Sequence, residues 1–152
     1  MNRRMALSLL VAVAAGVPIA LIRLPAAAAA EEITVYKDPN CGCCGQWVEH
    51  VTAAGFMVTV HDTADLGRIK TEFGVPEALQ ACHTAMVSGY VVEGHVPAAE
   101  IKRLLAERPK ARGLAVPGMP MGSPGMEQGS DREPYDVVLF QQDGTSTIFA
   151  RH

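Results

Sequence analysis

The sequence has few aromatic residues and no excess of positive charge. Phe, Trp and Tyr make up 5% of the 152 residues, and 13 basic residues face 16 acidic ones, which gives a net charge of −3. The absence of a basic patch argues against nucleic acid as a main partner. Only 4 cysteines are present, too few for a disulfide-dense miniprotein. The composition is neither collagen-like nor that of a fully disordered chain, so a single domain with its own core is expected.

Long apolar runs are confined to the N-terminus. Arg3 and Arg4 precede an apolar stretch at 5–22, and an alanine run at 26–30 ends just before the first acidic residues. This order is typical of a secretory signal peptide cleaved after Ala30. A retained membrane anchor is the alternative, because the stretch approaches the length that spans a bilayer. The paired arginines leave both the Sec and the twin-arginine export routes open.

Removal of residues 1–30 would change the charge of the chain and the setting of its cysteines. Three arginines and no acidic residue are lost, so the remaining 122 residues carry a net charge of −6. Such a protein suits cations and is repelled by nucleic acid and anionic lipid. Export to the periplasm also places the cysteines where disulfides form and persist. We therefore expect no nucleic-acid partner and no stable membrane span after processing.

Hydrophobic periodicity after the signal peptide predicts the element order β-α-β-α-β-β-α. Strands are expected at 33–36, 56–60, 84–87 and 90–92, and helices at 44–54, 63–73 and 97–108, with a short helical piece at 76–81. Asp62 or Thr63 is the expected cap of the second helix. This order, with cysteines between the first strand and the first helix, predicts an α/β fold of the thioredoxin-like class: a mixed sheet flanked by helices.

The composition changes after residue 112. Gly and Pro are so frequent at 116–130 that this segment is predicted to be flexible and without regular structure. Asp143-Gly144 between two β-rich runs predicts a C-terminal β-hairpin with a type I′ turn. The chain therefore divides into a signal peptide at 1–30, a thioredoxin-like domain at 31–127 that includes a Met-rich loop at 116–127, and a linker with the hairpin at 128–152.

Three of the four cysteines fall within four residues, at the predicted start of the first helix. The free N–H groups and the dipole of a helix N-terminus stabilise a thiolate there. Cys41 and Cys44 have the spacing of a redox dithiol, and Cys43 adds a third sulfur. Cys82, just before the third predicted strand, would face the same helix end in a thioredoxin-like fold. Four converging sulfurs predict a site for a soft ion such as Cu(I).

Two other interpretations of the cysteines stay open. Cys41 and Cys44 could be the active pair of a thiol–disulfide oxidoreductase, with Cys82 as a resolving thiol. Alternatively, an exported structural domain could simply have its even number of cysteines bridged. A structural zinc site is disfavoured, because such sites draw ligands from two well-separated pairs. Metal binding without turnover is preferred, and an enzyme would be a thiol- or copper-based oxidoreductase.

Imidazole and thioether groups extend the set of candidate ligands. His83 adjoins Cys82, although strand alternation could point the two side chains apart. His95 lies in a loop before the last predicted helix. Met119 and Met126 belong to no periodic face, and a thioether is a soft ligand suited to Cu(I). A linker without ligand function is the alternative for the Met-rich loop.

The remaining histidines and methionines have ordinary expected places. His50, His61 and His152 are expected at the surface. Met57 and Met86 lie within apolar strand patterns and are expected to fill the core.

Several ordered motifs resemble the exported CopG-type copper-resistance proteins, a family long described only as a domain of unknown function. The motifs are the runs at 36–44, 81–84, 93–97 and 117–126, together with Trp47 and His50. The resemblance implies a thioredoxin-like fold, a periplasmic location and a role in copper resistance, with copper donor or acceptor proteins as partners. It further implies copper as cofactor, preferably as Cu(I), with a thiolate-bridged site for more than one ion as one form that the family suggests. The ligands it implies are Cys41, Cys43, Cys44 and Cys82, with His83, His95, Met119 and Met126 as additional ones.

Overall fold

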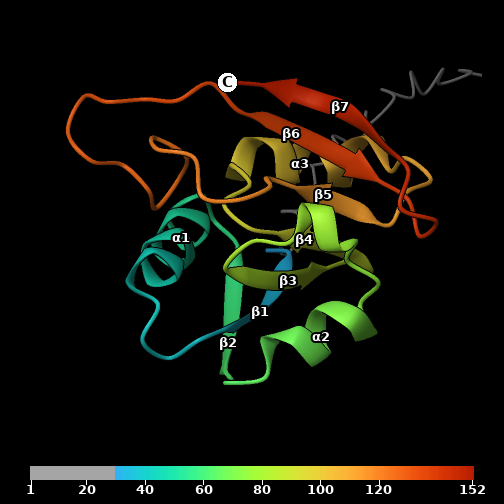
Figure 1. Cartoon of the computed structure of the whole chain (residues 1–152), viewed down its shortest axis with the longest axis horizontal. Coiled ribbons are helices and arrows are strands. Elements are labelled where there is room, and N and C mark those ends of the chain that lie inside the picture. Colours follow the sequence, from blue (N-terminus) through green and yellow to red (C-terminus); the bar gives the residue numbers. More distant parts are fainter. Residues whose placement is uncertain (1–29) are drawn as a thin grey trace, which may run out of the picture.

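The computed structural model describes residues 30–152, and the predicted signal peptide lies outside the described residues apart from Ala30. One mixed sheet has the strand order β2-β1-β3-β4-β5-β6-β7, with helices packed against it (Figure 1). No helix in this part of the chain is long and apolar enough to cross a membrane. The elements are β1 Glu32–Lys37, α1 Gly42–Ala53, β2 Met57–Asp62, α2 Leu66–Glu72, the 3-10 helix Glu77–Leu79, β3 His83–Val87, β4 Tyr90–Glu93, α3 Ala98–Glu107, β5 Gly113–Ala115, β6 Asp136–Phe140 and β7 Ser146–Arg151.

The first four strands confirm the predicted thioredoxin-like arrangement. Strand β1 pairs in parallel with β2 and antiparallel with β3, and β4 pairs antiparallel with β3. Helix α1 links the parallel pair, which no tight hairpin can do. Ser88 and Gly89 join β3 to β4 with φ values of 45° and 86°, the left-handed conformations of a type I′ turn.

Side-chain alternation along the strands produces a core on each face of the sheet. Ile33 and Val35 of β1 belong to the larger core, together with Trp47 of α1 and Ile101 of α3. The smaller core on the other face includes Val91 and the residues that follow α2. Helix α2 accordingly lies apart from α1 and α3 in Figure 1. The helices therefore flank both faces of the sheet, as predicted.

The start of α2 differs from the prediction. Asp62 is the last residue of β2 and forms an ion pair with Lys37, 2.9 Å from its Nζ. Asp65 instead caps the helix, since its Oδ1 accepts a hydrogen bond from the Arg68 amide at 3.3 Å. The strand extends two residues beyond its predicted end, and this extension moves the helix start along the chain.

Strand β5 was not predicted, and it joins the C-terminal hairpin to the rest of the sheet. It pairs in parallel with β4 and antiparallel with β6. Its first residue must be glycine, because a Cβ on Gly113 would lie 1.9 Å from the Val91 carbonyl oxygen. Three residues beside a Gly- and Pro-rich segment carry too little periodicity to reveal a strand. The hairpin is thereby part of the seven-stranded sheet.

The predicted C-terminal hairpin is present, but its turn is of a different type. Gly144 has a φ of +85°, whereas Asp143 is not in the left-handed region. The Gly144 amide donates to the Gln141 carbonyl at 3.1 Å, and the Gln141 amide donates to Thr145 at 2.8 Å. This pattern is a type I turn followed by a left-handed glycine, so the predicted type I′ turn is wrong.

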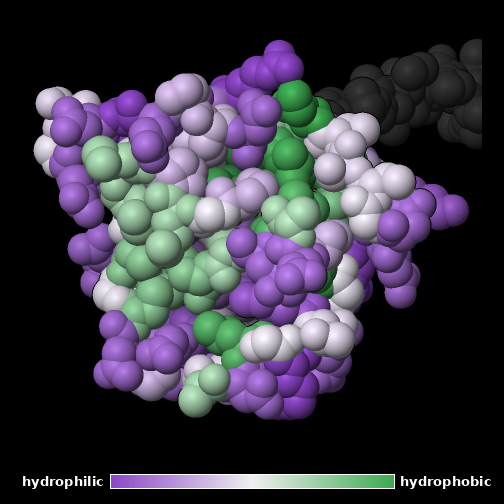
Figure 2. All heavy atoms as spheres, viewed as in Figure 1, coloured by the Kyte–Doolittle hydropathy of each residue, from purple (hydrophilic) through white to green (hydrophobic). Residues whose placement is uncertain are grey.

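Large hydrophobic side chains are exposed mainly at the two edges of the sheet. The Met57 side chain of β2 is 56% exposed, so its predicted place in the core is wrong, because β2 is an edge strand. Met86, on the inner strand β3, packs against the smaller core as predicted. Figure 2 shows mildly hydrophobic residues gathered over α1 and hydrophilic residues around the periphery.

Because β6 contributes to both cores, the hairpin should be needed for stability. Replacement of the fully buried Phe140 by Ala is expected to lower the free energy of unfolding by about 3–5 kcal/mol, since it leaves a large cavity. Ile148 on the neighbouring β7 is 48% exposed, and its replacement by Ala should cost no more than about 0.5 kcal/mol. Urea unfolding of both variants tests this, and equal losses would contradict the assignment of Phe140 to the core.

Candidate metal centre

Four sulfur atoms from two segments of the chain meet at the N-terminus of α1. The Sγ atoms of Cys41, Cys43, Cys44 and Cys82 all lie within 4.8 Å of one another. Helix α1 begins at Gly42, so the first three cysteines occupy its cap and its first turn. Cys82 directly precedes β3, which lies next to β1 in the sheet. Strand order therefore brings together sulfurs that are far apart in sequence, and we call them the sulfur cluster.

The sulfur cluster contains one disulfide and two free thiols. Cys41 and Cys44 are bonded, with their Cα atoms 5.4 Å apart, and Cys43 and Cys82 are free. The Cys43 Sγ lies 3.4 Å from the Cys41 Sγ. A closed disulfide withholds two sulfurs from any metal, and a supply of two electrons and two protons restores them as thiols. The cluster therefore offers two thiols when oxidised and four when reduced.

The Cys82 thiol is held in its protonated form by its surroundings. Burial raises the pKa of Cys82 to about 12, and the nearby Cys43 adds to this rise. The Cys82 Sγ lies 2.9 Å from the Nε2 atom of His95, within reach of a hydrogen bond. A metal ion that bound this sulfur would have to displace its proton, so binding at Cys82 would release a proton.

His95 is fixed in the tautomer that a metal ligand requires. Its Nδ1 atom lies 2.8 Å from the carbonyl oxygen of Pro124, and because a carbonyl only accepts, Nδ1 must donate. The lone pair is then on Nε2, which faces Cys82. Burial lowers the pKa of His95 and keeps the ring neutral. An imidazole oriented in this way through its second nitrogen is the usual arrangement of a metal-bound histidine.

The His83 ring lies at the same place, next to Cys82. Its Nδ1 atom is 3.4 Å from the Cys82 Sγ. Cys82 precedes β3, so strand alternation does not point its side chain away from that of His83. Burial, followed by the charges of His95 and Lys70, lowers the pKa of His83 well below its usual value. Its Nε2 atom is buried and has no hydrogen-bond partner among the described residues. Unpartnered buried nitrogens are uncommon, and a ligand would satisfy this one.

The only tryptophan of the chain packs behind the two histidines. The Trp47 ring lies 4.4 Å from the His83 ring, centroid to centroid. Its indole Nε1 donates to the Val96 carbonyl at 2.9 Å, which ties α1 to the residue after His95. Both contacts are buried, so the position of the thiol-bearing helix relative to the histidines is well defined.

The centre of the Met-rich loop is packed onto α1, so the prediction of a flexible segment is wrong there. Ser123, Pro124 and Gly125 are buried. Gly125 has a φ of +87°, and a Cβ on it would lie 2.7 Å from the Cys43 carbonyl oxygen. Met126 is half-buried directly after this contact, whereas Met119 is 53% exposed. Glycine at position 125 lets the loop approach the first turn of α1.

The other three histidines lie away from the sulfur cluster. His50 is half-buried, and its Nε2 accepts a hydrogen bond from the Ala98 amide at 3.0 Å. It thus caps α3, and its predicted place at the surface is wrong, because α1 and α3 pack on the same face. His61 and His152 are exposed, as predicted, and His61 stacks on Tyr36.

A group of buried charged residues was missed by the sequence analysis. Lys70 of α2 and Glu93 of β4 form a buried ion pair, and Thr84 of β3 hydrogen-bonds to both. The available signal was weak: Lys70 follows an apolar residue within the predicted helix at 63–73, and Glu93 directly follows the predicted strand at 90–92. Position within a periodic element does not reveal that a charge has a buried partner on another element.

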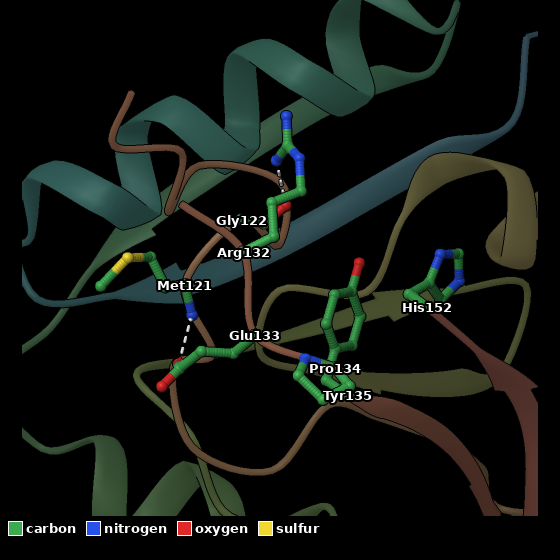
Figure 3. Close-up of a pocket in the computed structure, with 7 residues that line it drawn as sticks. All are labelled: Met121, Gly122, Arg132, Glu133, Pro134, Tyr135 and His152. Carbon is green, nitrogen blue, oxygen red and sulfur yellow. Dashed lines mark hydrogen bonds between the residues drawn. The ribbon is translucent and has the colours of Figure 1, made fainter. Parts of the chain in front are cut away.

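A surface pocket of about 490 Å³ lies beside the Met-rich loop rather than at the sulfur cluster. Glu133 accepts a hydrogen bond from the Met121 amide at 2.8 Å within it. Met121 and His152 lie on opposite sides of the pocket in Figure 3, so they do not form a joint ligand pair. Its lining residues are Met121, Gly122, Arg132, Glu133, Pro134, Tyr135 and His152.

Comparisons with known proteins point to copper resistance. Residues 79–126 match the model of a protein family described as DUF411, a protein of unknown function. A solved structure of copper resistance protein copG, form 2, is 46% identical, with a TM-score of 0.78, and the match covers 81% of this chain and 98% of that one. Form 1 of copG is 47% identical, with a TM-score of 0.76, and the match covers 80% and 96% of the two chains. No curated protein matches the chain at a significant level.

The buried neutral histidines should make stability depend on pH. Because burial lowers the pKa values of His83 and His95, the unfolded chain binds protons before the folded one. Stability is therefore complete above about pH 6.5 and falls below it, by up to about 1.4 kcal/mol per pH unit for each histidine. Urea unfolding between pH 8 and pH 5 measures this slope. The slope should be smaller in His83→Gln and unchanged in His61→Asn, and equal slopes in all three proteins would refute the assignment.

Proposed function

The chain belongs to the CopG-type copper-resistance family, and from this premise we propose that it is an exported, periplasmic protein that binds copper as Cu(I) through the sulfur cluster. The family relationship and the cluster together support a copper-related function. The convergence of four sulfurs within 4.8 Å of one another is the observation that carries the proposal. Thiolate sulfur is the ligand type that selects Cu(I) over hard ions.

The full sulfur set for Cu(I) is present only when the disulfide is open. With Cys41 and Cys44 bonded, two thiols and two imidazoles remain, whereas a reduced cluster presents four sulfurs. Thiolates can bridge metal ions, so four of them in so small a space would hold more than one Cu(I). Reduction of the disulfide therefore precedes full loading in this proposal, and oxidation would release part of the copper.

Imidazole and thioether groups complete the proposed site. His83 and His95 are neutral and lie against Cys82, which makes them the best additional ligands. Met126 follows the contact between the loop and α1, and Met119 is exposed to solvent. We assign the two thioethers to the capture of Cu(I) from solvent or from a partner, because an exposed soft ligand can bind the ion before it reaches the thiols.

By binding copper, the protein would keep the free ion from damaging other components of the periplasm. The protein would sequester Cu(I) or pass it between a periplasmic donor and an acceptor protein. For copper that arrives as Cu(II), the Cys41/Cys44 dithiol would give one electron to each of two ions, become the disulfide and release two protons. The acidic charge of the chain without its signal peptide favours cations. Turnover is not required by this proposal, and binding alone would confer resistance.

The second candidate function is thiol–disulfide exchange. The disulfide between Cys41 and Cys44 at the start of α1 favours it, since this is where redox dithiols lie in thioredoxin-like proteins. Cys82 would act as the resolving thiol. A third interpretation, a structural domain with bridged cysteines, is weakened by the two free thiols within the cluster.

A titration with Cu(I) tests the proposal. The purified protein, reduced without oxygen, is expected to compete for Cu(I) with a high-affinity chelator, because it presents four thiolates. Cys43→Ser and Cys82→Ser should each weaken binding by at least about 100-fold, since loss of a residue that merely orients a ligand already costs 10–100-fold. Competition with the chelator, followed by absorbance, measures the affinity of each protein.

Two comparisons separate the candidate functions. The double variant Met119→Leu/Met126→Leu should keep the affinity at equilibrium and slow the loading of Cu(I), whereas His61→Asn should change neither. Absence of tight Cu(I) binding by the reduced wild type would overturn the proposal. If Cys43→Ser keeps its copper while Cys41→Ser abolishes disulfide exchange with a model peptide, thiol–disulfide exchange is the function.

A further inference from the structure

A buried ion pair lies behind the sulfur cluster, on the face of the sheet that α2 covers. The Lys70 side chain of α2 is 6% exposed and that of Glu93 of β4 is fully buried. The Lys70 Nζ is 2.5 Å from the Glu93 Oε1 and donates to the Thr84 hydroxyl at 3.0 Å. Thr84 and Glu93 are direct neighbours across β3 and β4, so their side chains project from the same face.

The Glu93 carboxylate uses both of its oxygens to hold neighbouring segments. Its Oε1 accepts a hydrogen bond from the Ala81 amide at 2.7 Å as well as that from Lys70. Its Oε2 accepts from the Thr84 hydroxyl at 2.6 Å. The Glu93 carboxylate therefore holds Ala81 and Thr84, the two residues that flank Cys82 and His83.

Glu93 also stands at the base of the loop that carries His95. The intervening Gly94 passes so close to the 81–84 segment that a Cβ on it would lie 2.6 Å from the Ala81 Cβ. Its amide donates to the His83 carbonyl at 3.0 Å. One side chain thus links the segment of Cys82 and His83 to the segment of His95, which carry three of the proposed ligands.

The ion pair is a poor source of stability in itself. Desolvation of two buried charges offsets most of their attraction, and apolar residues of similar volume often serve as well. Glu93 shows this cost, because burial raises its pKa despite the opposing effect of Lys70. A geometric role explains better why three hydrogen-bonding groups converge on one carboxylate.

We propose that Glu93, held in place by Lys70 and Thr84, is a positioning residue that fixes Cys82 and His83 relative to His95 for metal binding. The inference rests on the proposed copper site, but it concerns different residues. Glu93 makes no contact with the metal in this proposal. It acts through the Ala81 amide and the Thr84 hydroxyl, on either side of the two ligands that it positions.

The test compares Glu93→Gln with a destabilised variant of α2, the helix that carries Lys70. Ile69, the buried neighbour of Lys70 on α2, is replaced by Ala to lower stability while every residue of both ligand segments is kept. Glu93→Gln should bind Cu(I) at least about tenfold more weakly than wild type, as do other variants of residues that orient a ligand. It should also shift the thiolate-to-copper absorption band. Ile69→Ala should lower Tm while keeping the affinity and the band of wild type.

A second measurement needs no metal. The Ala81 amide donates to Glu93 in the folded protein, so its hydrogen exchange by NMR should be at least about tenfold faster in Glu93→Gln. If this variant does not fold, Lys70→Met/Glu93→Gln replaces it, because it leaves no unpaired buried charge. In Glu72→Gln, which removes an exposed ion pair of α2, the exchange should remain unchanged.

The outcomes decide the two proposals separately. If Glu93→Gln keeps the affinity, the absorption band and the Ala81 exchange rate of the wild type, the positioning role is overturned. Equal losses of affinity in Glu93→Gln and Ile69→Ala would also overturn it, since stability alone would then explain them. Failure of the wild type to bind Cu(I) would overturn the copper site, while the Ala81 exchange would still show whether Glu93 restrains the segment.

Discussion

The packing of Trp47 is the contact on which the arrangement of the candidate site depends. Its ring lies against His83, its indole N–H donates to Val96, and its backbone is approached by Gly125 of the Met-rich loop. One residue of α1 therefore contacts or adjoins the other segments of the site, through its side chain or its backbone. In a protein with so few aromatic residues, this single large ring does what several smaller contacts would otherwise do. The cysteines of the same helix are placed as a result.

Two kinds of donor meet where these segments converge, and the protein restrains each differently. The sulfurs of α1 can be taken up in a disulfide or released from it, so their availability follows the redox state. Both imidazoles are buried and remain neutral, and His95 is also bonded to the Pro124 carbonyl. The two imidazoles stay in place while the number of free thiols changes with the redox state. The oxidised and the reduced site would therefore offer a metal two different environments. This contrast fits copper, whose two oxidation states prefer different ligands.

The sequence was sufficient for the order of the first elements and for the meeting of the four sulfurs. Strong periodicity and a distinctive Cys spacing carry that information locally. It was insufficient for β5, which is only three residues long, and for the contact of Gly125 with α1, which depends on the folded backbone. His50 and the Lys70–Glu93 pair were missed for a related reason. Their partners lie on other elements, and no local pattern encodes a partner that is distant in sequence.

The glycines at two close crossings beside the candidate site have a consequence for how such proteins diverge. Side chains at the candidate site could be exchanged for others of similar ligand chemistry, but Gly94 and Gly125 have backbone atoms of neighbouring segments close to where a Cβ would stand. Substitution there must move a whole segment. Among distant relatives these glycines should therefore persist longer than individual ligands. A sequence that keeps the cysteines but lacks both glycines would mark a lineage in which the site has been rebuilt or abandoned.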